Sequence, residues 1–391
     1  MPEDPSLRHA RLVLRQHQRE AAMGMPASAR DEHAAALHAA GEYERTASYE
    51  DDRVRVGPFR YPLWTELDRW RRTRAVIDRC APGPYEDGGF LAILARQAAS
   101  LEMYAAEPEM NPELAHVLER IVFGTTGRPD SHASTRLVGD GIVVEMSAGM
   151  MYFLYQAAKS VVLAWHLVEG PEGTPSTFST RAEDTRAVLD RDPTAADWLK
   201  RLLSAWLFDG VPRPPDSSLP PPRYGPALSL LISCAERFVL AHECVHAVVD
   251  LVRPAGFADL PVLAGWDKEF RADTWGVVMV VESAARYDRF APNMALQGPV
   301  LAMKAHELVQ RALAVVSPTV VSTTHPPFAD RLTAVLDAYS AIPGIADEPN
   351  LGPEPALAAA ETLELLWDRV AAGLEERLRS GDRLHPIWRM P

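Results

Sequence analysis

The sequence predicts an α+β protein that is predominantly α-helical. A long apolar segment between two prolines, Ala227 to Val252, has the length of a central helix, and Leu357 to Leu378 has the spacing of an amphipathic helix. Gly141 to Met146 has the composition of a strand, and Ser147-Ala148-Gly149-Met150 begins a helix after it. Helical patterns also alternate with turns from Tyr61 to Ile121. Helices therefore dominate, with a small sheet among them.

The segment 227–252 is apolar on nearly every side, which is typical of a buried helix. It contains His242-Glu243-Cys244-Val245-His246. In a helix, His242 and His246 lie one turn apart on one face, so both imidazoles can bind one metal ion. Glu243 then lies beside the pair, where it can take a proton from a water on the metal. This is the arrangement of a zinc hydrolase.

The alternative is a helix with two partly buried, hydrogen-bonded histidines. Neutral imidazoles and a carboxylate are costly inside an apolar helix unless something compensates them. A metal ion would do so, which favours the zinc interpretation.

A catalytic zinc needs a third protein ligand, and the next helical stretch offers Glu269. Asp273, four residues later and on the same face, can accept the second ring N–H of a histidine ligand. The alternative is a solvated acidic face paired with Lys268 and Arg271.

These motifs together resemble the gluzincin metallopeptidases, in particular the core shared by HtpX/Oma-like peptidases and minigluzincins. His-Glu-x-x-His is followed by Glu-x-x-Ala-Asp, and then by Ser322-Thr323-Thr324-His325-Pro326-Pro327, with Arg331 beyond. The last segment is similar to the Thr-His-Pro…Arg signature of that group. The resemblance extends from about Gly139 to Leu336 and implies a zincin-like core with a small β-sheet beside the metal-binding helix.

The resemblance implies roles for these residues. Zn²⁺ would be bound by His242, His246 and Glu269, with Glu243 as the general base. His325 would stabilise the tetrahedral intermediate, and Arg331 would fix its loop by pairing with a carboxylate such as Asp273. An ordinary loop histidine is the alternative for His325. Three other residues remain candidates for the oxyanion role: Tyr224, Tyr287 and His306.

The resemblance also implies that the strand 141–146 supplies the sheet edge that holds an extended substrate. The chain departs from the family pattern at Met150, where leucine is common. A peptide substrate needs such an exposed strand, whereas a small-molecule amidase needs a closed pocket.

Composition narrows the function classes. A formal charge of −13 argues against nucleic-acid binding by general electrostatics. One arginine cluster is expected to be a solvated helix face: Arg69, Arg71, Arg72, Arg74 and Arg79. Three cysteines give no disulfide framework, which fits a cytoplasmic protein.

No membrane span is expected, because the longest apolar stretch, Ile142 to Val168, contains charged and polar residues such as Glu145 and Lys159. The first residues, Met1-Pro2-Glu3-Asp4, show no secretory signal.

Four regions are predicted along the chain. Residues 1–50 form a helical or partly disordered arm, and residues 51–138 a helical N-terminal region. Residues 139–345 form the metallopeptidase core, and residues 346–391 a C-terminal helix and tail. The core contains a Pro-rich insertion near 170–226, expected to be an extended surface loop that serves as a lid or as an inert linker.

The predicted function is a zinc-dependent metallopeptidase that acts on a peptide or protein substrate. Two alternatives remain. One is a catalytically silent zinc-binding pseudo-peptidase with a regulatory or interaction role, although such a scaffold has no physical need for Glu243. The other is a zinc amidase with a small-molecule substrate. The sequence does not indicate an oligomeric state.

Overall fold

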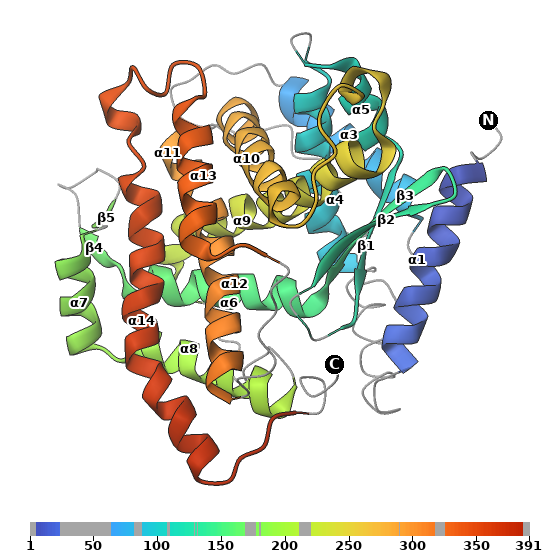
Figure 1. The fold of residues 1–391 in the computed structure, drawn as a ribbon. Helices are drawn as coiled ribbons and strands as arrows, with labels where there is room; N and C mark the ends of the chain where they lie inside the picture. The colour runs from blue at the N-terminus through green and yellow to red at the C-terminus, as the bar shows by residue number, and fades with distance from the viewer. Residues whose placement is uncertain are drawn as a thin grey trace. The chain divides into compact units, whose positions relative to one another are not determined.

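The computed structural model describes residues 5–23, 64–81, 88–107, 110–128, 130, 132–168, 177–179, 181–210, 220–288, 290–316 and 325–385. Helices dominate and two small sheets accompany them, as Figure 1 shows, so the predicted α+β class is confirmed. Within the described ranges, no helix is both long enough and apolar enough to cross a membrane.

The chain divides into two compact units. The first consists of residues 1–128, 133–148 and 247–260, and the second of residues 129–132, 149–246 and 261–391. The main elements of the first unit are α1 (Pro5–Met23), α3 (Trp64–Cys80), α4 (Gly88–Ala105), α5 (Pro112–Leu118), β1 (Ile121–Thr126), β2 (Ala133–Val138) and β3 (Gly141–Ser147).

The sheet of the first unit has the strand order β1-β3-β2. β1 runs parallel to β3, and β2 pairs with β3 as an antiparallel hairpin whose turn contains Gly139 at φ +60°. α1 lies on one face, where Ala10 and Leu14 pack against the central valines of β1 and β3 (Figure 1). The predicted N-terminal arm is therefore a packed helix as far as residue 23.

The expected strand at 141–146 is present as β3, but it is not a sheet edge. Its two sides are occupied by β1 and β2, so the prediction that it holds extended substrate is wrong. The outer side of β1 is also engaged by side chains. Arg79 donates to the carbonyl of Ile121 at 2.8 Å, the Cys80 sulfur accepts from the Phe123 N–H at 3.3 Å, and Gln18 donates to the carbonyl of Thr125 at 3.0 Å.

These contacts also correct the expectation of a solvated arginine face. Arg69 is only 4% exposed, and the Arg79 side chain is largely buried between β1 and Glu102. Arg74 is exposed, as predicted. The helix carries charge on the face that packs, and Arg79 satisfies the carbonyl of Ile121 and the carboxylate of Glu102 there.

The second unit is mostly helical. Its elements are α6 (Ala148–Ala164), β4 (His166–Val168), β5 (Thr177–Ser179), α7 (Ala182–Arg191), α8 (Thr194–Ser204), α9 (Gly225–Val245), α10 (Trp266–Ser283), α11 (Pro292–Ala295), α12 (Gln297–Val316), α13 (Phe328–Ser340) and α14 (Glu354–Arg379). Short π-helical turns follow three of these helices, at Ala205–Asp209, His246–Val252 and Ala284–Asp288, and residues 247–252 belong to the first unit.

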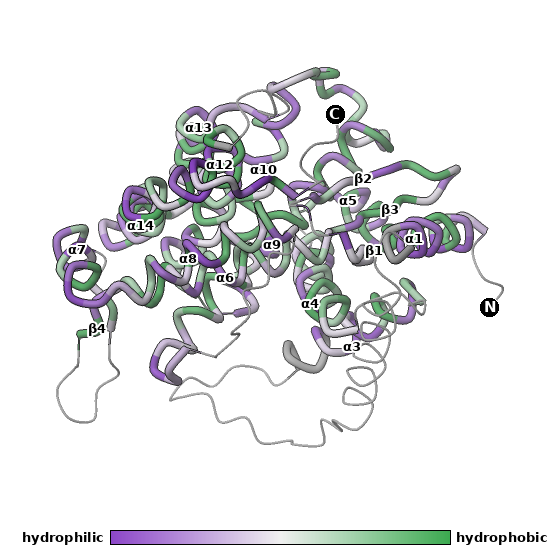
Figure 2. The backbone as a smooth tube through the Cα atoms, turned by 90° about the horizontal axis from the view of Figure 1, so that it is seen from below, coloured by the Kyte–Doolittle hydropathy of each residue, from purple (hydrophilic) through white to green (hydrophobic). Residues whose placement is uncertain are grey.

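α9 is the central helix of this unit and packs against both α10 and α12 (Figure 1). α6 and α9 are largely hydrophobic along their length, whereas α7 is mostly hydrophilic, as Figure 2 shows. α9 and α12 meet at Gly298. A Cβ there would lie 2.4 Å from backbone atoms of Cys234 and Ala235, so only glycine permits this approach without a shift.

The predicted long helix at 227–252 is confirmed, with a change from α to π geometry at His246. The predicted C-terminal helix is α14, and its apolar face, including Leu363 and Val370, is buried. Residues 142–164 of the apolar stretch 142–168 are a buried strand and helix, as predicted, and residues 166–168 form the more exposed strand β4.

The expected extended loop at 170–226 is wrong where the structure describes it. α7 and α8 occupy residues 182–204, and Trp198, Leu202 and Trp206 are buried. The prolines that suggested a loop lie mainly at 212–222, and residues 211–219 lie outside the described chain. The only proline between Asp192 and Gly210 is Pro193. It directly precedes α8, and proline is compatible with the start of a helix.

Candidate metal centre

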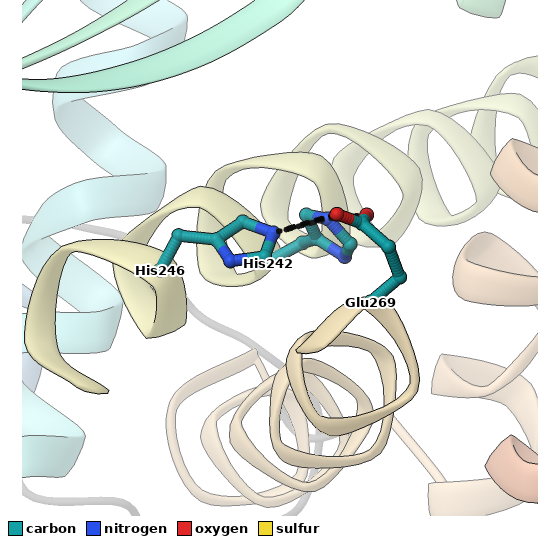
Figure 3. A group of neighbouring side chains, drawn as sticks. All are labelled: His242, His246 and Glu269. Atoms are coloured by element: carbon teal, nitrogen blue, oxygen red, sulfur yellow. Dashed lines mark hydrogen bonds and ion pairs between the residues drawn. The ribbon is translucent and has the colours of Figure 1, made fainter. Parts of the chain in front are cut away.

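Two helices of the second unit bring three possible metal ligands together. His242 of α9 and His246, the first residue of the π-helical turn that continues α9, lie one turn apart, and Glu269 lies near the start of α10 (Figure 3). Their ligand atoms all lie within 4.8 Å of one another. The Nε2 atoms of the two histidines are 3.1 Å apart, and the carboxylate of Glu269 is 3.3 Å from His242 Nε2 and 3.7 Å from His246 Nε2.

The Glu269 carboxylate is buried, yet one of its oxygens is poorly satisfied. No donor in the described part of the chain meets hydrogen-bonding geometry with Oε2, although the Nε2 atoms of His242 and His325 lie 3.3 and 3.4 Å away. A buried carboxylate oxygen without a hydrogen bond is costly. A cation between this oxygen and the imidazoles would compensate the cost.

Asp273, one turn beyond Glu269 on α10, lies directly behind His242. Its Oδ1 is 2.9 Å from His242 Nδ1, and its side chain is completely buried. Arg331 of α13 donates to both oxygens of this carboxylate, from Nε at 2.6 Å and Nη2 at 2.7 Å. The contact expected between Arg331 and a carboxylate is thus made to Asp273. The contact of Asp273 with Nδ1 of His242 directs the other ring nitrogen, Nε2, toward Glu269.

The electrostatics of His242 favour a positive charge at this place. Burial lowers the pKa of His242, but polar contacts with Asp273 and Glu269 and the charges of Asp273 and Glu243 outweigh it and raise the pKa to about 9. Burial raises the pKa of Glu269, yet the neighbouring imidazoles hold it well below the ordinary value. Two carboxylates around one imidazole stabilise a proton, and a metal ion can replace that proton.

Asp273 remains ionised for a related reason. Burial raises its pKa, but Arg331 and His242 more than compensate, and the pKa falls to about 2. The carboxylate is therefore available to orient the His242 ring at any pH above that value.

Glu243 follows His242 on α9 and is 8% exposed. It is not part of the three-residue ligand group, which fits a role other than metal ligation. Cys244, between the histidines in sequence, is buried as an apolar residue, and all three cysteines are free thiols.

His325 lies at the same centre, just before Pro326-Pro327 and α13. Its Nε2 is 3.4 Å from the carboxylate of Glu269, and its ring centroid is 6.4 Å from that of His242. Its side chain is 36% exposed, which makes it more accessible than His246 at 14% or Glu269 at 8%. The preceding Ser322-Thr323-Thr324 lies outside the described residues.

Of the three other oxyanion candidates, His306 of α12 lies at the centre, with its ring centroid 5.0 Å from that of His325. Burial lowers the pKa of His306 to about 3, and the positive charge of Arg331 acts in the same direction. Tyr224 precedes α9 and lies roughly 27 Å of helix from His242, and Tyr287, in the π-helical turn after α10, lies roughly 27 Å of helix from Glu269. The sequence did not distinguish these three, because α12 is brought to His325 only by the tertiary fold.

Comparison with known proteins is consistent with this centre. Residues 151–344 match the model of the family Peptidase U49. No curated protein and no solved structure matches the chain. The matched segment includes all the residues of the centre described above, from His242 to Arg331. The match supports a peptidase, and the region that resembles a peptidase family is the region that brings the candidate metal ligands together.

Proposed function

We propose that this protein is a zinc-dependent peptidase of the gluzincin type, with a zincin-like core. The observation that supports it most is the convergence of His242, His246 and Glu269 within a segment that matches a peptidase family. A peptidase needs a buried site with an activated water and a donor for the developing oxyanion. Glu243 is the candidate to activate the water, and His325 is the candidate donor.

The ligand spacing fits a tetrahedral metal. Ligands at about 2.1 Å from a tetrahedral zinc lie about 3.4 Å apart. The two Nε2 atoms are 3.1 Å apart, His242 Nε2 is 3.3 Å from Glu269 Oε2, and His246 Nε2 is 3.7 Å from Glu269 Oε1. These separations, which involve both carboxylate oxygens, are close to this value. Two imidazoles and one carboxylate are also a donor set of catalytic zinc sites, which leave one position for water.

Zinc bound here would lower the pKa of water toward about 7 and polarise the scissile carbonyl. Glu243 lies next to His242 on the helix, so its carboxylate can accept the proton of the attacking water. The same group would then return that proton to the leaving amine. Glu243 therefore serves first as general base and then as general acid.

His325 is the residue proposed to donate to the oxyanion. It borders Glu269 on the solvent-exposed side of the centre, whereas His242 and Asp273 are buried. Asp273 and Arg331 would act by positioning, because the charged pair fixes the ring of His242 through Nδ1. The substrate is a peptide or protein, in accordance with the family match.

Substitution of the two glutamates separates catalysis from metal binding. Glu243→Gln should keep stoichiometric zinc and lose peptide hydrolysis by about 10²-fold or more, since only the proton acceptor is removed. Glu269→Ala should lose zinc. Asp267 is exposed on the same turn of α10, and Asp267→Ala should keep both zinc and peptide hydrolysis. Metal content by mass spectrometry and cleavage of a peptide library, with and without chelator, measure both effects.

Each alternative has its own outcome. Full activity in Glu243→Gln would show that water activation lies elsewhere, and tight zinc in Glu269→Ala would show a different third ligand. Wild-type protein that holds zinc without cleaving any peptide would be a binding protein. Cleavage of small amides alone would identify an amidase.

A further inference from the structure

His306 of α12 has no role in the proposed function, yet it lies directly beside His325. The two rings are 5.0 Å apart between centroids, with their planes at 56°. This is the range in which two aromatic rings attract each other in a tilted arrangement. On its other side, His306 Nε2 lies 3.4 Å from the amide nitrogen of Gln310, one turn further along α12.

His325 therefore lies between two helices. The carboxylate of Glu269, on α10, is 3.4 Å from its Nε2, and the ring of His306, on α12, lies against its ring. A histidine in a connecting segment loses rotamer freedom when it acts in catalysis, and this ordering has a cost in free energy. A ring on a rigid helix can hold the imidazole in place before substrate binds.

α12 also holds the end of the same short segment. Lys304 Nζ lies 4.8 Å from the ring centroid of Phe328, the first residue of α13. Lys304 is fixed in turn by Glu307 at 2.5 Å and by Glu364 of α14 at 2.6 Å. The segment 325–328 thus contacts α12 at both ends, and its two central prolines restrict the backbone between them.

We propose that His306 is a positioning residue that holds the imidazole of His325 in its orientation toward Glu269. The inference rests on the proposed function, because His325 needs a fixed orientation only if it acts on substrate. His306 contributes its ring, through contact with the ring of His325, and is neither a metal ligand nor a group that touches substrate.

Substitutions of His306, with one control at another histidine, test the ring contact. His306→Ala removes the ring and should lower kcat about 10- to 100-fold, with KM and zinc content unchanged. His306→Phe keeps a ring of similar shape and should restore most of kcat. His166→Ala, at an exposed histidine of β4, is the matched control and should behave as wild type. If His306→Ala does not fold, His306→Leu retains the volume without the aromatic ring and has the same expected loss.

A second readout does not depend on activity. In metal-free protein, the rate at which diethylpyrocarbonate modifies His325, followed by mass spectrometry, should rise several-fold in His306→Ala and remain at the wild-type value in His306→Phe. Unchanged kcat together with an unchanged modification rate would overturn the proposal, as would loss of zinc in His306→Ala. If wild-type protein shows no metal-dependent cleavage, the proposed function fails, while the modification rates still decide whether His306 holds the ring.

Discussion

At the scale of single residues, Asp273 fixes the ring of His242 in the candidate metal centre. Its carboxylate is completely buried and is shared between His242 and Arg331. A buried charge is tolerated only when it is paired and hydrogen-bonded, and here both oxygens are used. The orientation of a candidate metal ligand on α9 therefore depends on a residue of α13.

Removal of Arg331 should leave that charge without its main partner. Arg331→Leu should lower the free energy of unfolding by about 3–5 kcal/mol, because an unpaired buried carboxylate remains. Arg74→Leu, in the exposed pair with Asp78, should change it by less than about 1 kcal/mol. Denaturant unfolding of metal-free protein measures both values, and equal effects would contradict the importance of burial.

At the scale of the element, α9 combines a hydrophobic surface with buried polar groups. Glu236, two turns before Glu243, is 5% exposed, and burial raises its pKa to about 8. Arg237 beside it is paired with Asp288 at 2.6 Å. The central helix therefore contains a carboxyl group that folding keeps protonated near neutral pH.

This carboxyl should make stability depend on pH in a definite direction. In the unfolded chain Glu236 ionises near 4.5, whereas in the folded protein it ionises near 8. Between pH 4.5 and about pH 8 the carboxyl group is ionised in the unfolded chain but still protonated in the folded protein. The free energy of unfolding therefore falls as pH rises through this range. Glu236→Gln should therefore be more stable than wild type by a few kcal/mol at pH 8 and equal to it near pH 4. Unfolding midpoints at both pH values test this, with exposed Glu376→Gln as the control.

At the scale of the whole molecule, the chain consists of two units, and the candidate metal centre belongs to the second. The first unit is organised around its three-stranded sheet, with α1 packed on one face. Ala10 of α1 is completely buried there, whereas Leu12 on the same helix is 54% exposed.

A charge at the buried position of α1 should destabilise the first unit. Ala10→Asp places an unpaired carboxylate among apolar side chains, and should cost several kcal/mol, about 2–7. Leu12→Asp should have almost no effect. In hydrogen exchange, β1 and β3 should lose protection in Ala10→Asp while α10 and α12 retain theirs. Equal loss in both units would contradict separate stabilisation of the first.

The centre was largely predictable because its spacing is local. His242, Glu243 and His246 are linked by helical periodicity, and the same argument places Asp273 one turn after Glu269. His306 was predictable only as one of several candidates, since its approach to His325 depends on how α12 packs. No sequence pattern within a single segment predicts the distance between His306 and His325.

The fold was predicted less well where pairing and packing decide. The strand β1 at Ile121–Thr126 is not among the elements predicted from the sequence, and the expectation that β3 is a sheet edge comes from the family resemblance alone. α7 and α8 are not predicted, because the prolines at 212–222 favour a loop while the helices lie before them, at residues 182–204. In both cases a neighbour distant in sequence determines the structure.

Gly298 influences the geometry of the candidate centre although it is not one of its residues. It has no functional group, yet it permits α12 to touch the backbone of α9. A methyl group at this point would force the helices apart, and His306, two turns later on α12, would move with its helix. The alignment of a loop imidazole with a carboxylate on another helix thus depends on a missing side chain at a crossing some distance away.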